Sequence, residues 1–348
     1  MKNKILMAMS GGIDSSVAAI ELRRKGYELK GVTFTQLTLD SPAVSEARQM
    51  ADDMGFEHHT LDMRREFHDS VICNFIDEYL HGRTPNPCVQ CNSNIKWGML
   101  QKFADEMGCF YIATGHYAQI ECTPEGRYFI RKGADEHKDQ SYFLWRLTQE
   151  NLSRTLFPLG GYTKAEVRQI ALDNGYEQLS KKGESQEICF IPDNDYRNFL
   201  RANVPDYDKK YKKGDFIDIN GKVLGKHQGF PNYTIGQRKG LGIGGRKESL
   251  FIISTDVKEN VIYVGEGDSH PGLYRRALRI LPHEVHWVEP SERMQVGERR
   301  RYQVRIRYRQ PLQGAELICR EEGLYILFDE PQRGIAAGQF AAWYDGEV

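Results

Sequence analysis

This chain lacks several sequence features, and each absence excludes a class of protein or a cellular location. No apolar run approaches the length that a membrane span needs. The opening Met1-Lys2-Asn3-Lys4 leads into a short apolar segment without a cleavage-site pattern, so we expect no signal peptide. We therefore expect a cytoplasmic location and no membrane partner. No lysine occurs after Lys258, although arginine is frequent there.

A disulfide framework is also not indicated. The seven cysteines are an odd number and are unevenly spaced. Cys88-Val89-Gln90-Cys91 forms one Cys-x-x-Cys, which alone fits a zinc half-site, a redox pair or cluster ligands. No second such pair and no His-x-x-x-His follows it, which argues against a structural zinc site, and we predict no metal ligands. Cys189 is a third candidate, and four cysteines are interpreted as packing residues: Cys73, Cys109, Cys122 and Cys319.

Net charge is −1, which argues against a wholly basic nucleic-acid binder. The arginines nevertheless cluster between Arg275 and Arg309. The period of two in 302–308 predicts a strand with one arginine-rich face. That face is either simply solvated or binds phosphates, and composition leaves both interpretations open.

The order of elements predicts the fold class. The 348 residues favour two or three domains. In the first part, strands predicted at 5–9, 29–34, 58–62 and 110–114 alternate with helices at 17–22, 45–54 and 94–107. This alternation predicts an α/β fold, a parallel sheet with helices on both faces, whose ligands bind at the carboxyl ends of its strands. A hairpin at 213–224 with an Asn-Gly turn then opens an all-β region. We place boundaries near Tyr196 and Pro271, giving domains 1–196, 197–270 and 271–348.

The most informative segment is Ser10-Gly11-Gly12-Ile13-Asp14-Ser15-Ser16, which lies between a strand and a helix. A glycine turn at a helix start gathers backbone N–H groups and suits a phosphate. Asp14 is expected either to cap the helix or to help hold Mg²⁺. The segment lacks the Gly-Lys-Ser/Thr of a Walker loop. It resembles the SGGxDS loop of the N-type ATP pyrophosphatases, which have an adenine-nucleotide α-hydrolase-like fold.

Further motifs carry a closer resemblance, to the tRNA-specific 2-thiouridylases of the MnmA/TrmU family. Their order and spacing match over nearly the whole chain. They comprise Ser10 to Ser16, Gly82 to Pro87 with Cys91-Asn92, Ala113 to Ala118, Lys138 to Leu144, Ser185 to Ile191, and Gly240 to Gly245. This resemblance implies an ATP pyrophosphatase domain, a small central β domain and a C-terminal β barrel. It also implies ATP-dependent 2-thiolation of the tRNA wobble uridine, by adenylation of the uracil C2 oxygen and sulfur transfer from a cysteine persulfide.

The resemblance assigns roles to matching positions. Cys91 would be the nucleophile and Cys189 the persulfide carrier. The residues implied for ATP are Ala8, Met9, Ser10, Gly11, Gly12, Ile13, Asp14, Ser15, Phe34 and Gly115. Those implied for the target base and the tRNA are Asn86, Pro87, Cys88, His116, Lys138, Asp139, Gln140, Arg307, Tyr308 and Gln339. The implied partners are ATP, Mg²⁺, the tRNA acceptors for Lys, Glu and Gln, and a sulfur donor or relay protein.

Cys88 departs from the family pattern, which has Asp at this position as a proposed acid/base. A thiol is a poorer proton donor and a stronger metal ligand than a carboxylic acid. Cys88, Cys91 and Cys189 could therefore hold a [4Fe–4S] cluster in the same reaction. Another alternative is an amide-forming ATP pyrophosphatase, which would not need the paired thiols.

Overall fold

The computed structural model describes residues 3–181 and 188–348. Its first part is built around five parallel strands, in the order β3-β2-β1-β4-β7. Their bounds are β1 Lys4–Ala8, β2 Glu28–Thr35, β3 His58–Asp62, β4 Tyr111–Ala113 and β7 Thr155–Leu156. The main helices are α1 Ile13–Arg24, α2 Pro42–Met54, α4 Cys73–Leu80, α6 Gly98–Glu106 and α8 Lys164–Asp173.

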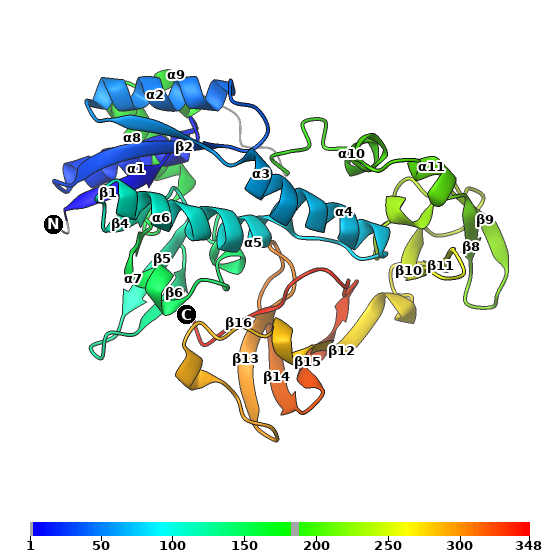
Figure 1. Cartoon of the computed structure of the whole chain (residues 1–348). Coiled ribbons are helices and arrows are strands. Elements are labelled where there is room, and N and C mark those ends of the chain that lie inside the picture. The colour runs from blue at the N-terminus through cyan, green and yellow to red at the C-terminus, as the bar shows by residue number, and fades with distance from the viewer. Residues whose placement is uncertain (1–2, 182–187) are drawn as a thin grey trace.

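Helices cover both faces of this sheet (Figure 1). Along β1, Ile5 and Met7 belong to the core shared with α1, α2 and α8. Leu6, between them, belongs to the opposite core, under α6. Successive strand residues point to opposite faces, so continuous apolar character is what a sheet buried on both sides requires. The predicted fold class is thus confirmed.

The topology also fixes where a ligand can bind. β1 lies between β2 and β4, so the chain runs outward in opposite directions from the β1/β4 pair. At such a point the loops that leave the two strands separate, and a crevice opens at the strand ends. Here these loops begin at Met9 and at Thr114.

One predicted helix differs from the structure. It was expected to begin at Asn94, but a continuous helical run begins at α5 (Pro87–Gln90). That run passes through a π-helical segment, η2 (Cys91–Trp97), before α6. A second π-helical segment, η1 (His68–Ile72), joins the short helix α3 (Arg64–Phe67) to α4. Sequence patterns with the 3.6-residue period of an α-helix do not reveal these wider turns.

Small helices and a hairpin complete the first part. They are α7 Gln149–Ser153, α9 Glu177–Lys181, the hairpin β5 Ala118–Cys122 with β6 Tyr128–Lys132, and η3 Ser141–Phe143. After them, α10 Tyr196–Asn203 and α11 Tyr207–Lys210 lead into the β region.

Two further sheets follow (Figure 1). The central one has the order β10-β11-β8-β9, from β8 Gly214–Ile217, β9 Val223–His227, β10 Leu250–Asp256 and β11 Val261–Glu266. β8 and β9 form the predicted hairpin, with Gly221 at φ 82° in its turn. The last sheet is antiparallel, with the order β12-β15-β14-β13-β16, from β12 Tyr274–Ile280, β13 Arg299–Arg305, β14 Gln313–Arg320, β15 Gly323–Arg333 and β16 Ala342–Tyr344. The three-domain division at 196 and 270 stays a prediction.

The predicted arginine-rich face at 302–308 is only partly present. β13 ends at Arg305, and that residue is 8% exposed, whereas Arg299 and Arg301 are exposed. Arg305 Nη1 donates to Asp139 Oδ2 at 3.1 Å. The Asp139 carboxylate, which lies far away in the sequence, therefore keeps Arg305 buried and off the exposed face. The same hydrogen bond joins the last sheet to the first part of the chain. Within the described residues, no helix has the length and apolar character to cross a membrane.

Candidate active site

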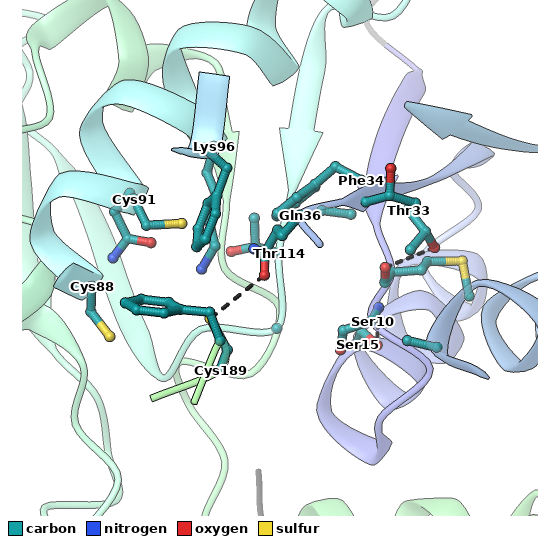
Figure 2. A pocket seen from close by; sticks show the side chains of 18 of the residues that line it. Ser10, Ser15, Thr33, Phe34, Gln36, Cys88, Cys91, Lys96, Thr114 and Cys189 are labelled. Atoms are coloured by element: carbon teal, nitrogen blue, oxygen red, sulfur yellow. Dashed lines mark hydrogen bonds between the residues drawn. The ribbon is translucent and has the colours of Figure 1, made fainter. Parts of the chain in front are cut away.

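A cavity of about 520 Å³ opens at the crevice between the β1 and β4 loops. One side is formed by the Ser10 loop and the end of β2, and the other by α5, η2 and the segment around Cys189. Figure 2 shows the two groups facing each other, with Ser10 and Ser15 on one side and Cys88, Cys91 and Cys189 on the other. The cavity thus joins a phosphate-type loop to three thiols.

Local hydrogen bonds hold the Ser10 loop in its turn. Ser10 N donates to Ser15 Oγ at 3.1 Å, and Ser15 Oγ donates to Gly12 O at 3.1 Å. Ser16 Oγ also donates to Gly12 O, at 3.0 Å. Seven of the residues predicted for ATP line the cavity: Ala8, Met9, Ser10, Asp14, Ser15, Phe34 and Gly115. Gly11, Gly12 and Ile13 are not among its lining residues.

Two glycines permit close backbone approaches at this end of the sheet. Gly11 has φ +67°, and a Cβ there would lie 2.7 Å from Glu46 Oε2 and 2.9 Å from Ala43 O. A side chain at Gly11 would thus collide with α2. A Cβ on Gly115 would lie 2.9 Å from Ser15 N, so the two loops meet only because Gly115 lacks a side chain.

Asp14 does not cap its helix, because Gly12 occupies the N-cap position and makes no side-chain capping bond. Instead, Lys164 Nζ lies 2.6 Å from Asp14 Oδ1, and Tyr117 Oη donates to the same oxygen at 2.7 Å. Burial and the Asp14 charge raise the pKa of Tyr117, so the phenol stays protonated as a donor. Both donors take Oδ1, which leaves Oδ2 for a cation. Sequence reasoning missed both partners, since each lies more than 100 residues from Asp14 (separations of 150 and 103).

The three thiols of the cavity share one cation. Desolvation in the cavity raises the pKa of Cys91, which is buried, to about 12, and that of Cys189, which stays accessible from the cavity, to about 11. The same desolvation raises the pKa of Cys88, which is also accessible. The positive charge of Lys96 opposes the increase at all three sulfurs. Figure 2 shows Lys96 pointing into the cavity beside them.

The π-helical segment η2 explains why Cys91 and Lys96 line the same cavity. In an α-helix residues five apart are rotated by about 140°, so they face different directions. In a π-helix, in which the hydrogen bonds run from i to i+5, the turn is wider and residues five apart lie much closer to the same face. Here the segment spans Cys91–Trp97, and both side chains reach the cavity. Lys96 was not predicted, because its role depends on this turn.

His116 holds Lys96 in place. Lys96 Nζ lies 3.3 Å from His116 Nε2, and Thr114 Oγ1 lies 2.6 Å from His116 Nδ1. Burial, and then the Lys96 charge, lower the pKa of His116 well below its usual value, so the ring is neutral. A neutral ring that accepts at Nε2 carries its proton on Nδ1 and donates to Thr114. His116 is 8% exposed.

Cys189 lies opposite the end of β2. Its Sγ donates to Gln36 Oε1 at 3.5 Å. Ile188 and Phe190 line the cavity on either side of it. The preceding motif residues Ser185, Gln186 and Glu187 lie outside the residues that the structure describes.

The residues predicted to contact the base and the tRNA fall into two groups. Pro87, Cys88, His116 and Gln140 line the cavity. The others, Asn86, Lys138, Asp139, Arg307, Tyr308 and Gln339, lie outside it. Asp139 is 2% exposed and accepts hydrogen bonds from Gly133 N, Ser141 N and Ser141 Oγ. Because it is buried and also accepts from Arg305, its role in this structure is to hold Arg305.

Two of these outer residues, Gln339 and Tyr308, connect the last sheet to the first part, whereas Arg307 bonds within the C-terminal region. Gln339 Nε2 donates to Thr84 O at 2.9 Å and to Pro85 O at 3.1 Å, next to Asn86. Tyr308 packs on Phe143, with ring centroids 4.5 Å apart, and its Oη donates to Lys138 O at 3.5 Å. Arg307 is exposed and donates to Gly334 O. Whether these residues touch tRNA stays a prediction.

The interpretation of the other cysteines as packing residues needs correction. Cys109 is buried and Cys319 is partly buried, as expected. Cys73 and Cys122, however, are exposed. Each lies on the outer side of its element, and for Cys122 the polar neighbours Glu121 and Thr123 already indicate this.

The parallel sheet, the Ser10 loop at its crevice and the thiols across the cavity define a nucleotide-utilising enzyme of the ATP pyrophosphatase class. Family models match the chain in three consecutive stretches. They are a tRNA methyl transferase HUP domain at 3–193, a tRNA methyl transferase PRC-barrel domain at 198–266 and an aminomethyltransferase beta-barrel domain at 277–348.

Curated relatives match over the full length. The tRNA-specific 2-thiouridylase MnmA of Christiangramia forsetii is 42% identical, over 99% of this chain and 98% of that protein. Those of Amoebophilus asiaticus and Cytophaga hutchinsonii are 42% and 41% identical, over 99% of this chain and 93% and 95% of those proteins. The chain belongs to the tRNA-specific 2-thiouridylase MnmA family.

Proposed function

We propose that this chain catalyses ATP-dependent 2-thiolation of the wobble uridine of tRNA. The observation that carries the proposal is the single cavity that places Cys91 and Cys189 across from the Ser10 loop. Its substrates would be the tRNA acceptors for Lys, Glu and Gln, with sulfur from a donor or relay protein. Because the substrate is tRNA, the enzyme would act in the cytoplasm.

Activation of the base is the first task. The C2 carbonyl of uracil is a poor electrophile, because oxygen is a poor leaving group. Adenylation attaches the AMP moiety of ATP to that oxygen and releases pyrophosphate toward the Ser10 loop. The modified oxygen can then leave C2 as part of AMP, which is a good leaving group. Asp14 Oδ2 is the carboxylate oxygen available to hold Mg²⁺ on the phosphates, while Lys164 and Tyr117 fix the other oxygen.

Sulfur transfer is the second task. The terminal sulfur of a Cys189 persulfide attacks C2, and AMP leaves. The Cys91 thiolate then attacks the Cys189 sulfur, and the electron pair of the broken S–S bond goes to the sulfur now on C2. The product is a thiolated uridine with a Cys91–Cys189 disulfide, which an external thiol reductant must reopen.

Lys96 supports both thiols in this step. A thiolate is the nucleophile, yet desolvation in the cavity keeps Cys91 and Cys189 protonated at neutral pH. The Lys96 ammonium is the cation that favours the charged form of each sulfur. Its hydrogen bond to neutral His116 keeps it directed into the cavity, which makes His116 a positioning residue.

The test is tRNA-dependent AMP release together with thiolated nucleoside in the tRNA product. Cys91→Ser and Cys189→Ser should each abolish thiolation and keep ATP binding. Cys319→Ser, a partly buried cysteine outside the cavity, is the matched control and should keep activity. AMP release without tRNA, or thiolation by both cavity variants, would contradict the proposal and favour an amide-forming synthetase.

The presence of Cys88 supports an alternative in which the same reaction uses a [4Fe–4S] cluster. Its thiol lines the same cavity as Cys91 and Cys189, and three thiolates suit a [4Fe–4S] cluster with one open iron. These three residues would hold the cluster, which would supply an iron site for sulfide. Brown absorbance, iron and labile sulfide in enzyme purified without oxygen, all lost in Cys88→Ser, would favour it. A colourless and active Cys88→Ser enzyme would favour the persulfide route.

A further inference from the structure

Three side chains that can bind a metal meet at η1, outside the cavity. His68 Nδ1 lies 3.0 Å from Asp69 Oδ1 and 3.8 Å from Cys73 Sγ. All three ligand atoms lie within 4.8 Å of one another. Among residues 3–181 and 188–348, no other set of three or more His, Cys, Asp or Glu side chains meets this criterion. The proposed function uses none of the three.

The π-helical turn creates this meeting. η1 spans His68–Ile72, and Cys73 follows it directly. The i to i+5 turn, in which Cys73 N donates to His68 O, brings the two side chains toward one face, whereas an α-helix would rotate them apart by about 140°. Such turns are rare and concentrate at functional sites.

The contacts at His68 are unlike those of a hydrogen-bonded relay. In a relay of thiol, imidazole and carboxylate, the two neighbours use different ring nitrogens. Here the Cys73 sulfur and the Asp69 oxygen both face Nδ1. A ring nitrogen has either one proton or one lone pair, so it satisfies only one of them. A cation between the three atoms would satisfy all of them.

The two separations from His68 Nδ1 are also close to those around a tetrahedral ion. Zinc lies about 2.3 Å from a thiolate and about 2.0–2.1 Å from an imidazole or carboxylate, which puts its ligand atoms about 3.4–3.6 Å apart. The observed 3.0 Å and 3.8 Å bracket this range. Mixed sulfur, nitrogen and oxygen donors suit zinc and similar divalent ions.

We propose that His68, Asp69 and Cys73 form a binding site for a zinc-like divalent ion, with water as the fourth ligand. Cys73 binds as the thiolate, and its proton goes to solvent. All three residues are exposed, so the ion has free access. Arg65, 3.8 Å from Asp69 Oδ2, is the nearby cation, and its 90% exposed side chain can move away. Because Val71 of the same turn lines the cavity, the ion would stiffen one wall of the active site from behind.

Co²⁺ is the probe, because cobalt bound to a thiolate absorbs in the near ultraviolet. The parent is the full chain with Cys88, Cys91, Cys189 and Cys122 replaced by serine, which removes the three cavity thiols and the remaining exposed one. We expect Co²⁺ to give the charge-transfer band in this parent, and Zn²⁺ to displace it. Cys73→Ser in the parent should abolish the band and His68→Ala should weaken it, while Cys319→Ser should leave it unchanged.

A second measurement needs no substitution. In the wild-type chain, Zn²⁺ should slow alkylation of Cys73 but not of Cys122, as mass spectrometry of the labelled peptides would show. A band that survives Cys73→Ser, no band in the parent, or equal labelling of Cys73 with and without Zn²⁺ would overturn the proposal. None of these readouts depends on tRNA thiolation, so the site and the proposed function can fail separately.

Discussion

Lys96 Nζ lies 3.3 Å from the Nε2 atom of His116, a buried and neutral histidine whose other ring nitrogen faces Thr114. This contact joins the π-helical segment that carries Cys91 to the loop after β4. The cation beside the thiols is therefore fixed by the same loop that approaches the phosphate side of the cavity.

Lys96→Met should slow alkylation of Cys91 at fixed pH. Without the ammonium the pKa of the thiol rises further, and each unit lowers the thiolate fraction about tenfold. Lys96→Arg, which keeps the charge, is the control. The rate of Cys91 labelling, followed by mass spectrometry without ATP or tRNA, checks this. Equal rates in wild type and Lys96→Met would show that the cation does not act on this sulfur.

Stability should fall at alkaline pH through Cys91. Its pKa in the folded protein, about 12, lies above its ordinary value of 9.0, so the folded state binds the proton more tightly. This contribution is complete below pH 9.0 and is lost as pH rises toward 12. Denaturant unfolding from about pH 8 to about pH 10 should thus show a steeper decline for wild type than for Cys91→Ser. Parallel declines would refute the assignment.

Gly11→Ala should destabilise the fold, whereas Gly12→Ala should not. A non-glycine residue at φ +67° costs about 1–2 kcal/mol, and the new Cβ also meets α2. Gly12 has ordinary φ, and its Cβ would meet nothing closer than Ser10 Oγ at 3.5 Å. Thermal unfolding of the two variants makes the comparison, and equal melting temperatures would contradict it.

Arg305→Met should cost about 3–5 kcal/mol of unfolding free energy, because it leaves the buried Asp139 carboxylate without its cation. Arg301→Met is the matched control on the same strand. Its ion pair with Asp329 is exposed, so about 1 kcal/mol or less is expected. Urea unfolding of both variants measures the difference. Similar losses of unfolding free energy would contradict the expected difference between the buried and the exposed ion pair.

Arg307→Ala should weaken tRNA binding and make it less dependent on salt, with little change in ATP affinity. One lost phosphate contact flattens the log–log salt slope by about 0.7–0.9. Lys209→Ala, an exposed cation on α11, should leave the slope unchanged. Filter binding across a salt series measures both slopes. An unchanged slope in Arg307→Ala would show that Arg307 does not contact a phosphate, and would favour the interpretation that this face is simply solvated.

Sequence patterns could predict the parts of the structure that depend on residues close together in the chain. The strands at 29–34 and 58–62 follow from the alternation of strands with helices, and the helix end follows from Gly55, which is left-handed. The crevice follows from the order of strands and helices. Asp14 with Lys164 and Asp139 with Arg305 could not be predicted, because their separations of 150 and 166 residues leave no local signal.

The π-helical turns were unpredictable for a different reason. The apolar spacing of residues 91–97 does not distinguish an α-helix from a π-helix over so short a segment. Both Lys96 and the His68–Cys73 contact depend on such turns. The features that sequence reasoning missed are therefore concentrated where the helix departs from its regular period.

The protonated state of the cavity thiols has a consequence for the resting protein. Hydrogen peroxide and other oxidants react with thiolates, and Cys91 and Cys189 have pKa values of about 12 and about 11. At neutral pH almost none of either sulfur is in the reactive form. Both sulfurs should therefore resist oxidation to sulfenic acid in the protein without substrate, although the proposed reaction requires each of them.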